Sequence, residues 1–190
     1  GANRVIEAFR RHPTLRGYLL DAEGPILGAY TEATNIMVTL RKSLPDVAIG
    51  LASYRYWKLH RDLPWKEFRE HCDFDAPQVY WEQATNAASQ LQSSYNEFQL
   101  FDRKLPYVPA GSAYKVGTWS ATPAQVTEFL TKAKELKMSG TTFWVWYQSQ
   151  RDLPATYEAV AKYQWDIPVQ SSLTLEQKVD ILWKKYSGEV

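Results

Sequence analysis

The sequence predicts an α/β fold built on a parallel sheet, and three observations lead to that prediction. Short apolar runs alternate with amphipathic segments along residues 2–163. The apolar runs are nearly continuous, which is typical of parallel strands that are buried on both faces. Helix-start and turn signals separate the runs, so each strand returns to the sheet through a helix.

Three strands and three helices are expected in the first half of the chain. Apolar residues recur at helical spacing in Ala33, Met37 and Leu40. His12-Pro13 ends the first helix, and Pro64 lies in the first turn of the third, where the missing N–H has no helical partner to lose. The expected strands are 17–23, 47–54 and 74–81, and the second helix is expected over 30–43.

Two further strands are expected in the second half, at 107–113 and 141–147. Asn86 precedes an amphipathic segment and can cap it. Thr122-Pro123-Ala124-Gln125 is a strong helix start, because Thr and Gln form a capping box around a proline at the first helical position. Gly140 ends that helix, and a last helix runs from Leu153 to Lys162.

Five strands do not close a barrel of eight, which needs about 250 residues. The pattern therefore predicts either an open sheet or the C-terminal five β/α units of a TIM (β/α)8 barrel, with parallel strands and a C-terminal helical extension. The partial barrel is expected over residues 1–163. The chain starts with Gly1 rather than Met, so we expect it to be part of a longer chain or assembly.

Residues 164–190 differ from the repeating units. Thr174-Leu175-Glu176-Gln177 is a second capping box, and apolar residues follow it at helical spacing. We expect a linker or a packing helix in this region.

Charge is balanced, with 22 Lys and Arg against 21 Asp and Glu. A field strong enough to recruit nucleic acid is therefore not expected. No apolar run approaches the ~20 residues that span a bilayer, so no membrane insertion is expected. Aromatic residues make up 14% of the chain, with 8 Trp and 12 Tyr. They fit either a large aromatic core or stacking surfaces for a flat ligand, for which sugars are the better candidates.

Neither a cofactor nor a metal is expected. His12, His60 and His71 follow no ligand spacing. Cys72 is the one cysteine, and we expect it to pack as a small apolar residue rather than act as a catalytic thiol. Asp73 and Asp75 precede a strand and are expected to be turn or cap residues.

The feature that points to chemistry is the acid pair Asp21 and Glu23, at the end of the first strand. Residues two apart in a strand share a face, so the two side chains lie side by side with Cα atoms roughly 6–7 Å apart. The carboxyl ends of strands are where barrel enzymes place their chemistry. The alternative is a structural pair bonded to Lys or Arg, or to a helix N-terminus.

Several strand ends resemble glycoside hydrolase barrels. Tyr18-Leu-Leu-Asp-Ala-Glu23 resembles the fourth strand of family-25 lysozymes and family-18 chitinases. Pro77-Gln-Val-Tyr-Trp81 resembles the sixth strand of the family-18 type, and Phe143-Trp-Val-Trp146 the eighth. Ser53-Tyr54-Arg55 and Pro109-Ala-Gly-Ser-Ala-Tyr114 resemble a bacterial and phage group of lysozyme-like domains. The resemblance covers residues 2–163, which correspond to strands four to eight of such a barrel.

The resemblance implies hydrolysis of an N-acetylhexosamine polysaccharide, with bacterial peptidoglycan as the first candidate. It implies that Glu23 is the general acid with a raised pKa and that Asp21 stays ionised as orienter and charge stabiliser. Tyr80 would bind the substrate acetamido group. An extracellular, cell-envelope or virion-associated location follows. The expected substrate-binding residues are Tyr54, Arg55, Gln78, Trp81, Tyr114, Trp144 and Trp146.

Two departures from the family pattern keep a second class of function open. The Asp-x-Asp-x-Glu of chitinases is reduced to Leu19-x-Asp21-x-Glu23, and Trp81 replaces the carboxylate that follows the sixth-strand tyrosine. The alternative is a non-catalytic carbohydrate-binding or structural barrel module of an extracellular or virion assembly. A third possibility is an open-sheet α/β protein unrelated to sugars.

Overall fold

The computed structural model describes residues 1–165 and has an α/β architecture with parallel strands. The parallel strands are β1 (Gly17–Asp21), β2 (Ala48–Ala52), β3 (Phe74–Asp75), β4 (Ala110–Ser112) and β7 (Thr142–Trp144). The helices are α1 (Ala2–Arg11), α2 (Tyr30–Ser43), α3 (Trp65–Arg69), α4 (Ala87–Phe98), α5 (Pro123–Glu135), α6 (Trp146–Asp152) and α7 (Pro154–Ala161). Two short 3-10 helices, η1 (Gly24–Ile26) and η2 (Trp57–Leu59), and an antiparallel hairpin of β5 (Lys115–Val116) and β6 (Trp119–Ser120) complete the described chain.

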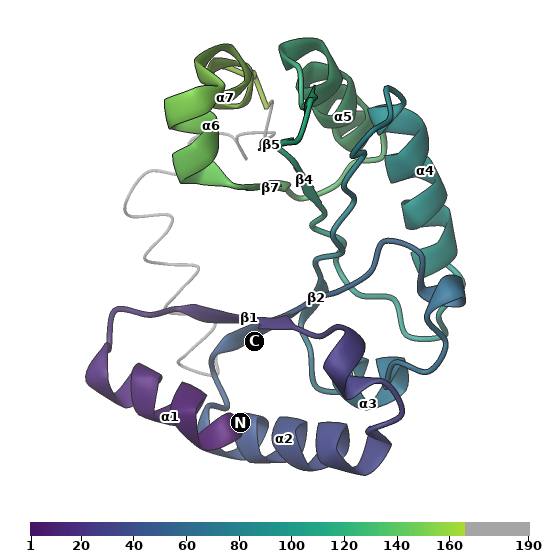
Figure 1. The fold of residues 1–190 in the computed structure, drawn as a ribbon. Coiled ribbons are helices and arrows are strands. Elements are labelled where there is room, and N and C mark those ends of the chain that lie inside the picture. Colours follow the sequence, from purple (N-terminus) through teal and green to yellow (C-terminus); the bar gives the residue numbers. More distant parts are fainter. Residues whose placement is uncertain (166–190) are drawn as a thin grey trace, which may run out of the picture.

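The strands pair in the order in which they occur in the chain. β1, β2 and β3 form one parallel sheet, and β4 pairs with β7 in another. Isolated parallel bridges from Asp75 to Tyr107 and from Gln78 to Ala110 join the two. The strands form an arc, with the helices along its outer side and with β1 and β7 at its two ends (Figure 1). The predicted parallel sheet with helical crossovers is confirmed, and its closure into a barrel stays a prediction.

Regular strand pairing is shorter than the sequence predicts. The expected strand 74–81 pairs regularly only at Phe74–Asp75, because Pro77 has no N–H to contribute to a ladder. The expected strand 107–113 is reduced to Ala110–Ser112. The expected strand 141–147 ends at Trp144, and helix α6 begins at Trp146. Trp144 and Trp146 are two apart within the expected strand and would share a face there. In the structure they do not, because Trp146 belongs to the helix.

The helices agree well with the sequence. The second helix spans Tyr30–Ser43, as predicted. The capping box of α5 is present, since Thr122 Oγ1 accepts from the Gln125 N–H at 3.3 Å and Gln125 Oε1 accepts from the Thr122 N–H at 3.0 Å. Asn86 stands at the start of α4, but its side chain accepts from Gln90 rather than from a backbone N–H.

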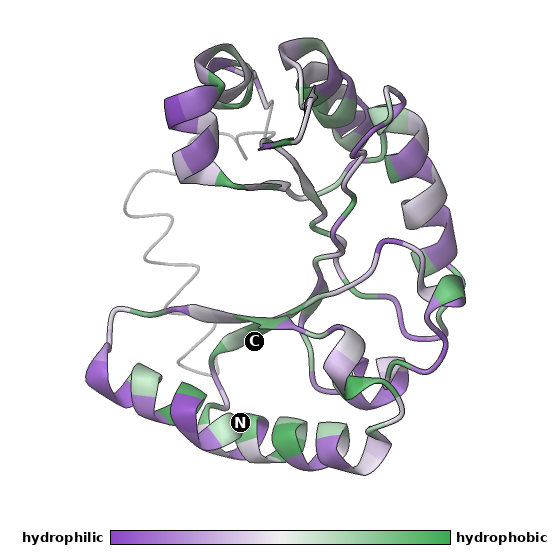
Figure 2. Ribbon diagram, in the orientation of Figure 1, coloured by the Kyte–Doolittle hydropathy of each residue, from purple (hydrophilic) through white to green (hydrophobic). Residues whose placement is uncertain are grey.

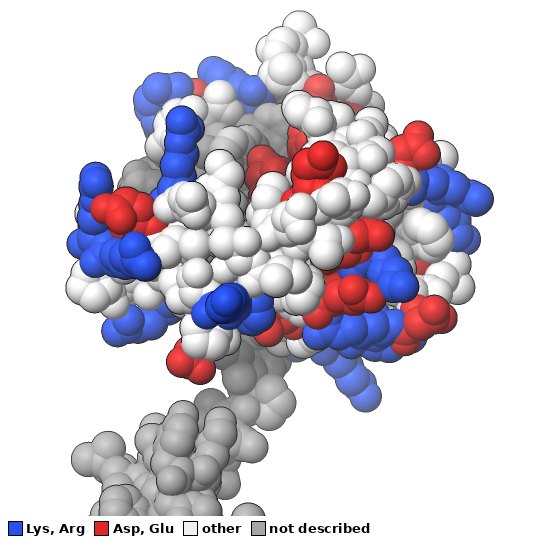
Figure 3. All heavy atoms as spheres, turned by 90° about the horizontal axis from the view of Figure 1, so that it is seen from below, with Lys and Arg blue, Asp and Glu red and all other residues white. Residues whose placement is uncertain are grey.

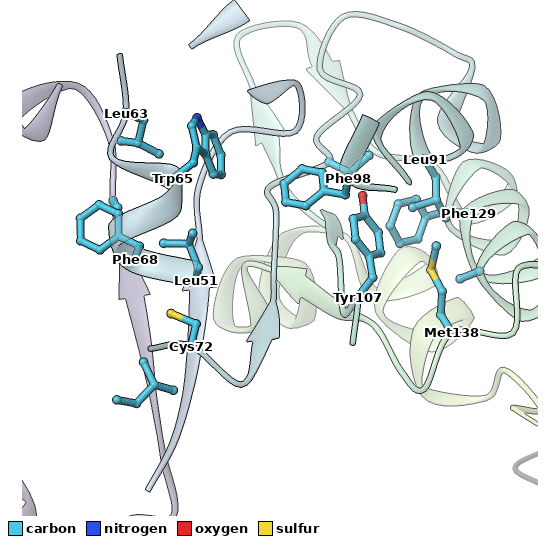
Figure 4. Packing of buried hydrophobic residues seen from close by; sticks show 14 of the residues in the cluster. Leu51, Leu63, Trp65, Phe68, Cys72, Leu91, Phe98, Tyr107, Phe129 and Met138 are labelled. Carbon is cyan, nitrogen blue, oxygen red and sulfur yellow. The ribbon is translucent and has the colours of Figure 1, made fainter. Parts of the chain in front are cut away.

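Buried apolar side chains form one cluster, in which two neighbouring groups can be seen (Figure 4), and the Trp65 and Phe98 rings connect these groups with centroids 5.8 Å apart. Leu51, Leu63 and Phe68 fill the space between β2 and α3, whereas Phe98 and Phe129 pack with their neighbours under α4 and α5. Hydrophobic and hydrophilic residues are mixed along each helix (Figure 2), as expected of helices that turn one face to a sheet and the other to solvent.

The lone cysteine lies inside the first of these groups. Cys72 is fully buried, and burial is the main cause that raises the pKa of its thiol to about 12. A thiol in that state is protonated at neutral pH and is not a nucleophile. Cys72 therefore packs as an apolar residue.

One predicted turn residue is instead part of a buried ion pair. Asp75 accepts two hydrogen bonds from the Arg69 guanidinium, at 2.9 and 2.8 Å, and both side chains are at most 5% exposed. Burial raises the pKa of Asp75, and Arg69 opposes that change. Asp73 instead connects β2 and α2, because its carboxylate accepts from the Ile49 N–H at 2.7 Å and from Arg41 at 2.9 Å.

Charged side chains of both signs are interspersed on the face that Figure 3 shows. This agrees with the balanced composition and with the absence of a one-sign field there. Of the helices that the structure describes, none has the length and apolar character to cross a membrane.

Candidate functional site

The acid pair lies where two parallel strands end. Asp21 is the last residue of β1, and Glu23 comes directly before η1. Between them, the Ala22 N–H donates to the Ala52 carbonyl at 2.9 Å. The Ala22 carbonyl in turn accepts from Ser53 Oγ at 2.6 Å. The backbone that carries both carboxylates is therefore fixed to the end of β2.

One amide group joins the two carboxylates. Gln78 Nε2 donates to Asp21 Oδ1 at 3.0 Å and to Glu23 Oε1 at 2.6 Å. Within residues 1–165, neither carboxylate takes part in a salt bridge. The structural alternative, in which the pair serves to bind a Lys or an Arg, therefore finds no support in the described chain. The same residues hold no grouping of three or more His, Cys, Asp or Glu side chains suited to a metal ion.

Three effects act on the pKa of the Asp21 carboxyl. Burial raises the pKa of its carboxyl, the charge of Glu23 raises it further, and the hydrogen bond from Gln78 lowers it. The resemblance implies that Asp21 is the carboxylate that stays ionised. The structure instead makes Asp21 a carboxyl that holds its proton more readily than a free aspartate does.

Glu23, but not Asp21, lines a pocket of about 330 Å³. The other residues that line it come from the loop after β2, from η2 and from the segment that follows β3: Tyr54, Arg55, Tyr56, Leu59, His60, Gln78 and Tyr80. The Tyr54 and His60 rings are stacked, with centroids 3.5 Å apart and planes 9° from parallel. This stack gives the pocket a flat, rigid wall near the Glu23 carboxylate.

Tyr80 links the acid pair to a second group of polar residues. Its ring meets the Tyr114 ring edge-on at 5.7 Å, and the Tyr114 hydroxyl donates to Glu82 Oε2 at 3.0 Å. Burial raises the pKa of Tyr80 most, and the neighbouring Tyr114, Asp21 and Glu23 raise it further. The pKa of Tyr114 is raised to about 12, chiefly by burial. Both hydroxyls are therefore protonated, and able to donate hydrogen bonds, at neutral pH.

Three predicted binding residues lie away from the acid pair. Trp81 is fully buried against Phe129, and its Nε1 donates to Gln125 at 3.3 Å, so neither indole face is open to a sugar. This corrects the prediction that Trp81 stacks on a ligand. Trp144 and Trp146 are 58% and 64% exposed, but Trp144 ends β7 and Trp146 begins α6, at the opposite end of the run of strands from β1.

The structure also places residues at the site that the sequence did not single out for it. Tyr56 and His60 line the pocket, and Glu82 accepts from Tyr114. Tyr56 directly follows the predicted Tyr54-Arg55, so adjacency alone could have indicated it. The stacking of His60 on Tyr54 depends on the path of the loop through η2, for which the sequence carries no periodic signal.

Comparisons with known proteins give only distant structural similarity. The chain matches no protein-family model, and no curated protein is significantly similar to it. The glycoside hydrolase domain of PgaB (BpsB) from Bordetella bronchiseptica is 12% identical with a TM-score of 0.49, over 70% of this chain and 42% of that one. Bee venom hyaluronidase bound to a hyaluronic acid tetramer is 14% identical with a TM-score of 0.45, over 84% of this chain and 57% of that one. A monoclinic crystal form of the same hyaluronidase is 13% identical with a TM-score of 0.44, over 84% and 59%.

The chain therefore spans about half the length of the solved structures that it resembles. None of these three is a family-25 lysozyme or a family-18 chitinase, so those families stay a prediction from the sequence motifs.

Proposed function

We propose that this chain carries the acid pair of a glycoside hydrolase that cleaves an N-acetylhexosamine polysaccharide, with peptidoglycan as the first candidate substrate. The observation that carries the proposal is the Asp21–Glu23 pair, held by Gln78 at the carboxyl ends of parallel strands and beside a pocket lined by tyrosines. Glycoside cleavage uses two carboxyl groups in different roles, which such a pair can supply.

Glu23 is the general acid in this proposal, because it is the carboxyl group that opens onto the pocket. It gives its proton to the glycosidic oxygen as the bond to the anomeric carbon breaks. Water then adds to the anomeric carbon, and its proton returns to the Glu23 carboxylate. Asp21, in its ionised form, supports the positive charge that develops on the sugar, either directly or by orienting the acetamido group.

Tyrosine hydroxyls supply the neutral hydrogen-bond donors for the sugar. Tyr80 donates to the acetamido carbonyl in this proposal, a role that its raised pKa supports because the hydroxyl keeps its proton. The Tyr54 ring, stacked on His60, forms a wall of the sugar pocket. Arg55 and Tyr114 contact more distant parts of the glycan. An extracellular or envelope location, and a place in a longer chain or assembly, follow from a cell-wall substrate.

A non-catalytic carbohydrate-binding module is the second candidate. The observation in its favour is the group of exposed aromatic rings where β7 passes into α6, namely Trp144, Trp146 and Tyr147, each at least 58% exposed. Exposed rings of this kind bind sugar faces by stacking, whether or not the acid pair is active.

Replacement of Glu23 by Gln tests the catalytic proposal. In the full chain, Glu23→Gln is expected to lower the turnover of peptidoglycan or chito-oligosaccharides by about 10²–10⁴-fold, the usual contribution of a general acid. Binding of the same sugars is expected to persist. Glu32→Gln, an exposed site on α2, is the matched control and is expected to leave turnover unchanged.

Two other results would change the assignment. Undiminished turnover by Glu23→Gln would exclude Glu23 as the acid. Sugar binding by the parent protein, with no detectable turnover, would favour the binding module.

A further inference from the structure

The side chain of Gln78 makes an uncommon pair of contacts. Its amide nitrogen carries two hydrogens, and they are shared between two different carboxylates, Asp21 at 3.0 Å and Glu23 at 2.6 Å. Both hydrogens are therefore committed within the protein, and only the amide oxygen is left to meet a ligand. The other oxygen of each carboxylate has no hydrogen-bond partner among residues 1–165 and is available to a substrate.

The backbone around Gln78 is fixed on two sides. The Gln78 N–H donates to the Ser53 carbonyl at 2.8 Å, and Gln78 forms parallel bridges with both Tyr54 and Ala110. The next residue, Val79, donates to the Ala110 carbonyl at 2.8 Å. Gln78 therefore lies between the end of β2 and the start of β4 and cannot shift along either of them. Its amide is held at a set distance from β1, where the acid pair lies.

The acid pair has little other compensation for its charge. Among residues 1–165, Gln78 is the one side chain that donates to either carboxylate. The titratable groups around the pair are Tyr18 on β1, Tyr80 after β3, and four residues that line the pocket after β2: Tyr54, Arg55, Tyr56 and His60. Tyr18 and Tyr80 are neutral at working pH, because burial raises the pKa of both hydroxyls. Two carboxylates that bind the same amide nitrogen repel one another, and this shared donor offsets that repulsion.

We infer that Gln78 is a positioning residue for the Asp21–Glu23 pair: it sets the separation of the two carboxylates and how they share protons, and it does not act as a sugar ligand. The claim that Gln78 matters for catalysis rests on the proposed function. The claim that Gln78 positions the two carboxylates rests only on its hydrogen bonds to them. Without the amide, repulsion between the two carboxylates drives proton uptake by Asp21 at higher pH, and the Glu23 carboxylate is free to turn away from the pocket.

Gln78→Met tests the inference, because methionine has a similar length and no N–H to donate. A carboxyl-carbon NMR titration is expected to show Asp21 holding its proton to higher pH than in the parent protein. The pH profile of kcat/KM is expected to move to higher pH as well, with a loss of about 10²-fold at its maximum, as expected when a catalytic group is misplaced. Gln92→Met on α4, whose amide bonds only to Asn96, is the matched control.

The outcomes separate this inference from the proposed function. If Asp21 titrates alike in Gln78→Met and in the parent protein, the inference is overturned, whatever the turnover. If the titration moves but neither protein turns over sugar, the positioning of the pair stands and the hydrolase proposal fails. Should Gln78→Met not fold, Gln78→Asn replaces it. Its amide is one methylene too short to reach both carboxylates, and the same change in the Asp21 titration is expected.

Discussion

Asp21 shows how a single residue can serve a site at a cost to the fold. Burial and the charge of Glu23 both raise its pKa, so the native protein holds the Asp21 proton more tightly than the unfolded chain does. A carboxyl of this kind stabilises the native state least when it is ionised. The stabilisation that the Asp21 carboxyl contributes is therefore fully present below 3.8, the pKa of aspartate in the unfolded chain. It is lost as the pH rises through the pKa of Asp21 in the folded protein.

Asp21→Asn is expected to raise the midpoint of thermal unfolding at pH 7, because the neutral amide has no charge to desolvate. At a pH below 3.8 the advantage is expected to disappear, since the native aspartate is then protonated too. Melting curves across that pH range check the prediction. Asp46→Asn, an exposed site in the turn after α2, is the control. An equal gain at low and neutral pH would mean that the effect does not come from ionisation.

At the scale of elements, the sequence predicted helices better than strands, and the reason is physical. The α5 capping box is formed by residues three apart, so the signal and the structure occupy the same stretch of chain. Strand length depends on partners far away in the sequence, and Pro77 limits the pairing after β3. Helix α6 was missed because Val145, at its N-cap, makes no side-chain cap, and the apolar run before it has the composition of a strand.

The residues of the candidate site also differ in how well the sequence predicts them. Asp21, Glu23, Gln78 and Tyr80 could be predicted because parallel strands bring their carboxyl ends to one edge of a sheet. Trp81 was misplaced because side chains alternate along an extended segment. Tyr80 points to the pocket, so the next side chain points to α5 and is buried there.

Close packing between β4, β7 and α5 gives a prediction at the scale of elements. A Cβ at Gly111 would lie 2.7 Å from the Phe143 ring and 3.1 Å from the Phe129 ring. Gly111→Ala is therefore expected to cost about 1–3 kcal/mol of unfolding free energy, as overpacking usually does. Urea denaturation measures it. Gly140→Ala, where a Cβ would meet nothing within 4 Å, is the control. Equal stabilities for the two variants would show that the rings move aside freely.

At the scale of the whole molecule, the described chain leaves the arc of strands open at β1 and β7. Leu19 on β1 is 50% exposed and Trp144 on β7 is 58% exposed, which is unusual for large apolar side chains on parallel strands. An uncovered edge strand has backbone groups without partners and is a place where further strands can add.

Amide hydrogen exchange tests how open this edge is. The Ala22 N–H donates to β2, so the alternate Leu19 N–H points away from β2. The Leu19 amide is expected to exchange at least about ten times faster than the Ala22 amide, since exchange follows local opening. Equal protection of the two amides would instead indicate a further strand on β1, as a closed barrel requires.

The hydrogen bond from Ser53 to the Ala22 carbonyl has a consequence for any attempt to move this site to another protein. The two acids are only two positions apart in the sequence, yet β2 fixes their backbone and Gln78 fixes their side chains. A graft of the Asp21-Ala-Glu23 tripeptide alone would lack the residues that orient the two carboxylates, namely Ser53 and Gln78. The smallest piece able to carry the pair in its present geometry runs from β1 through Ala110, because Ala110 also fixes the backbone of Gln78. The site is therefore inherited as a unit of neighbouring strands.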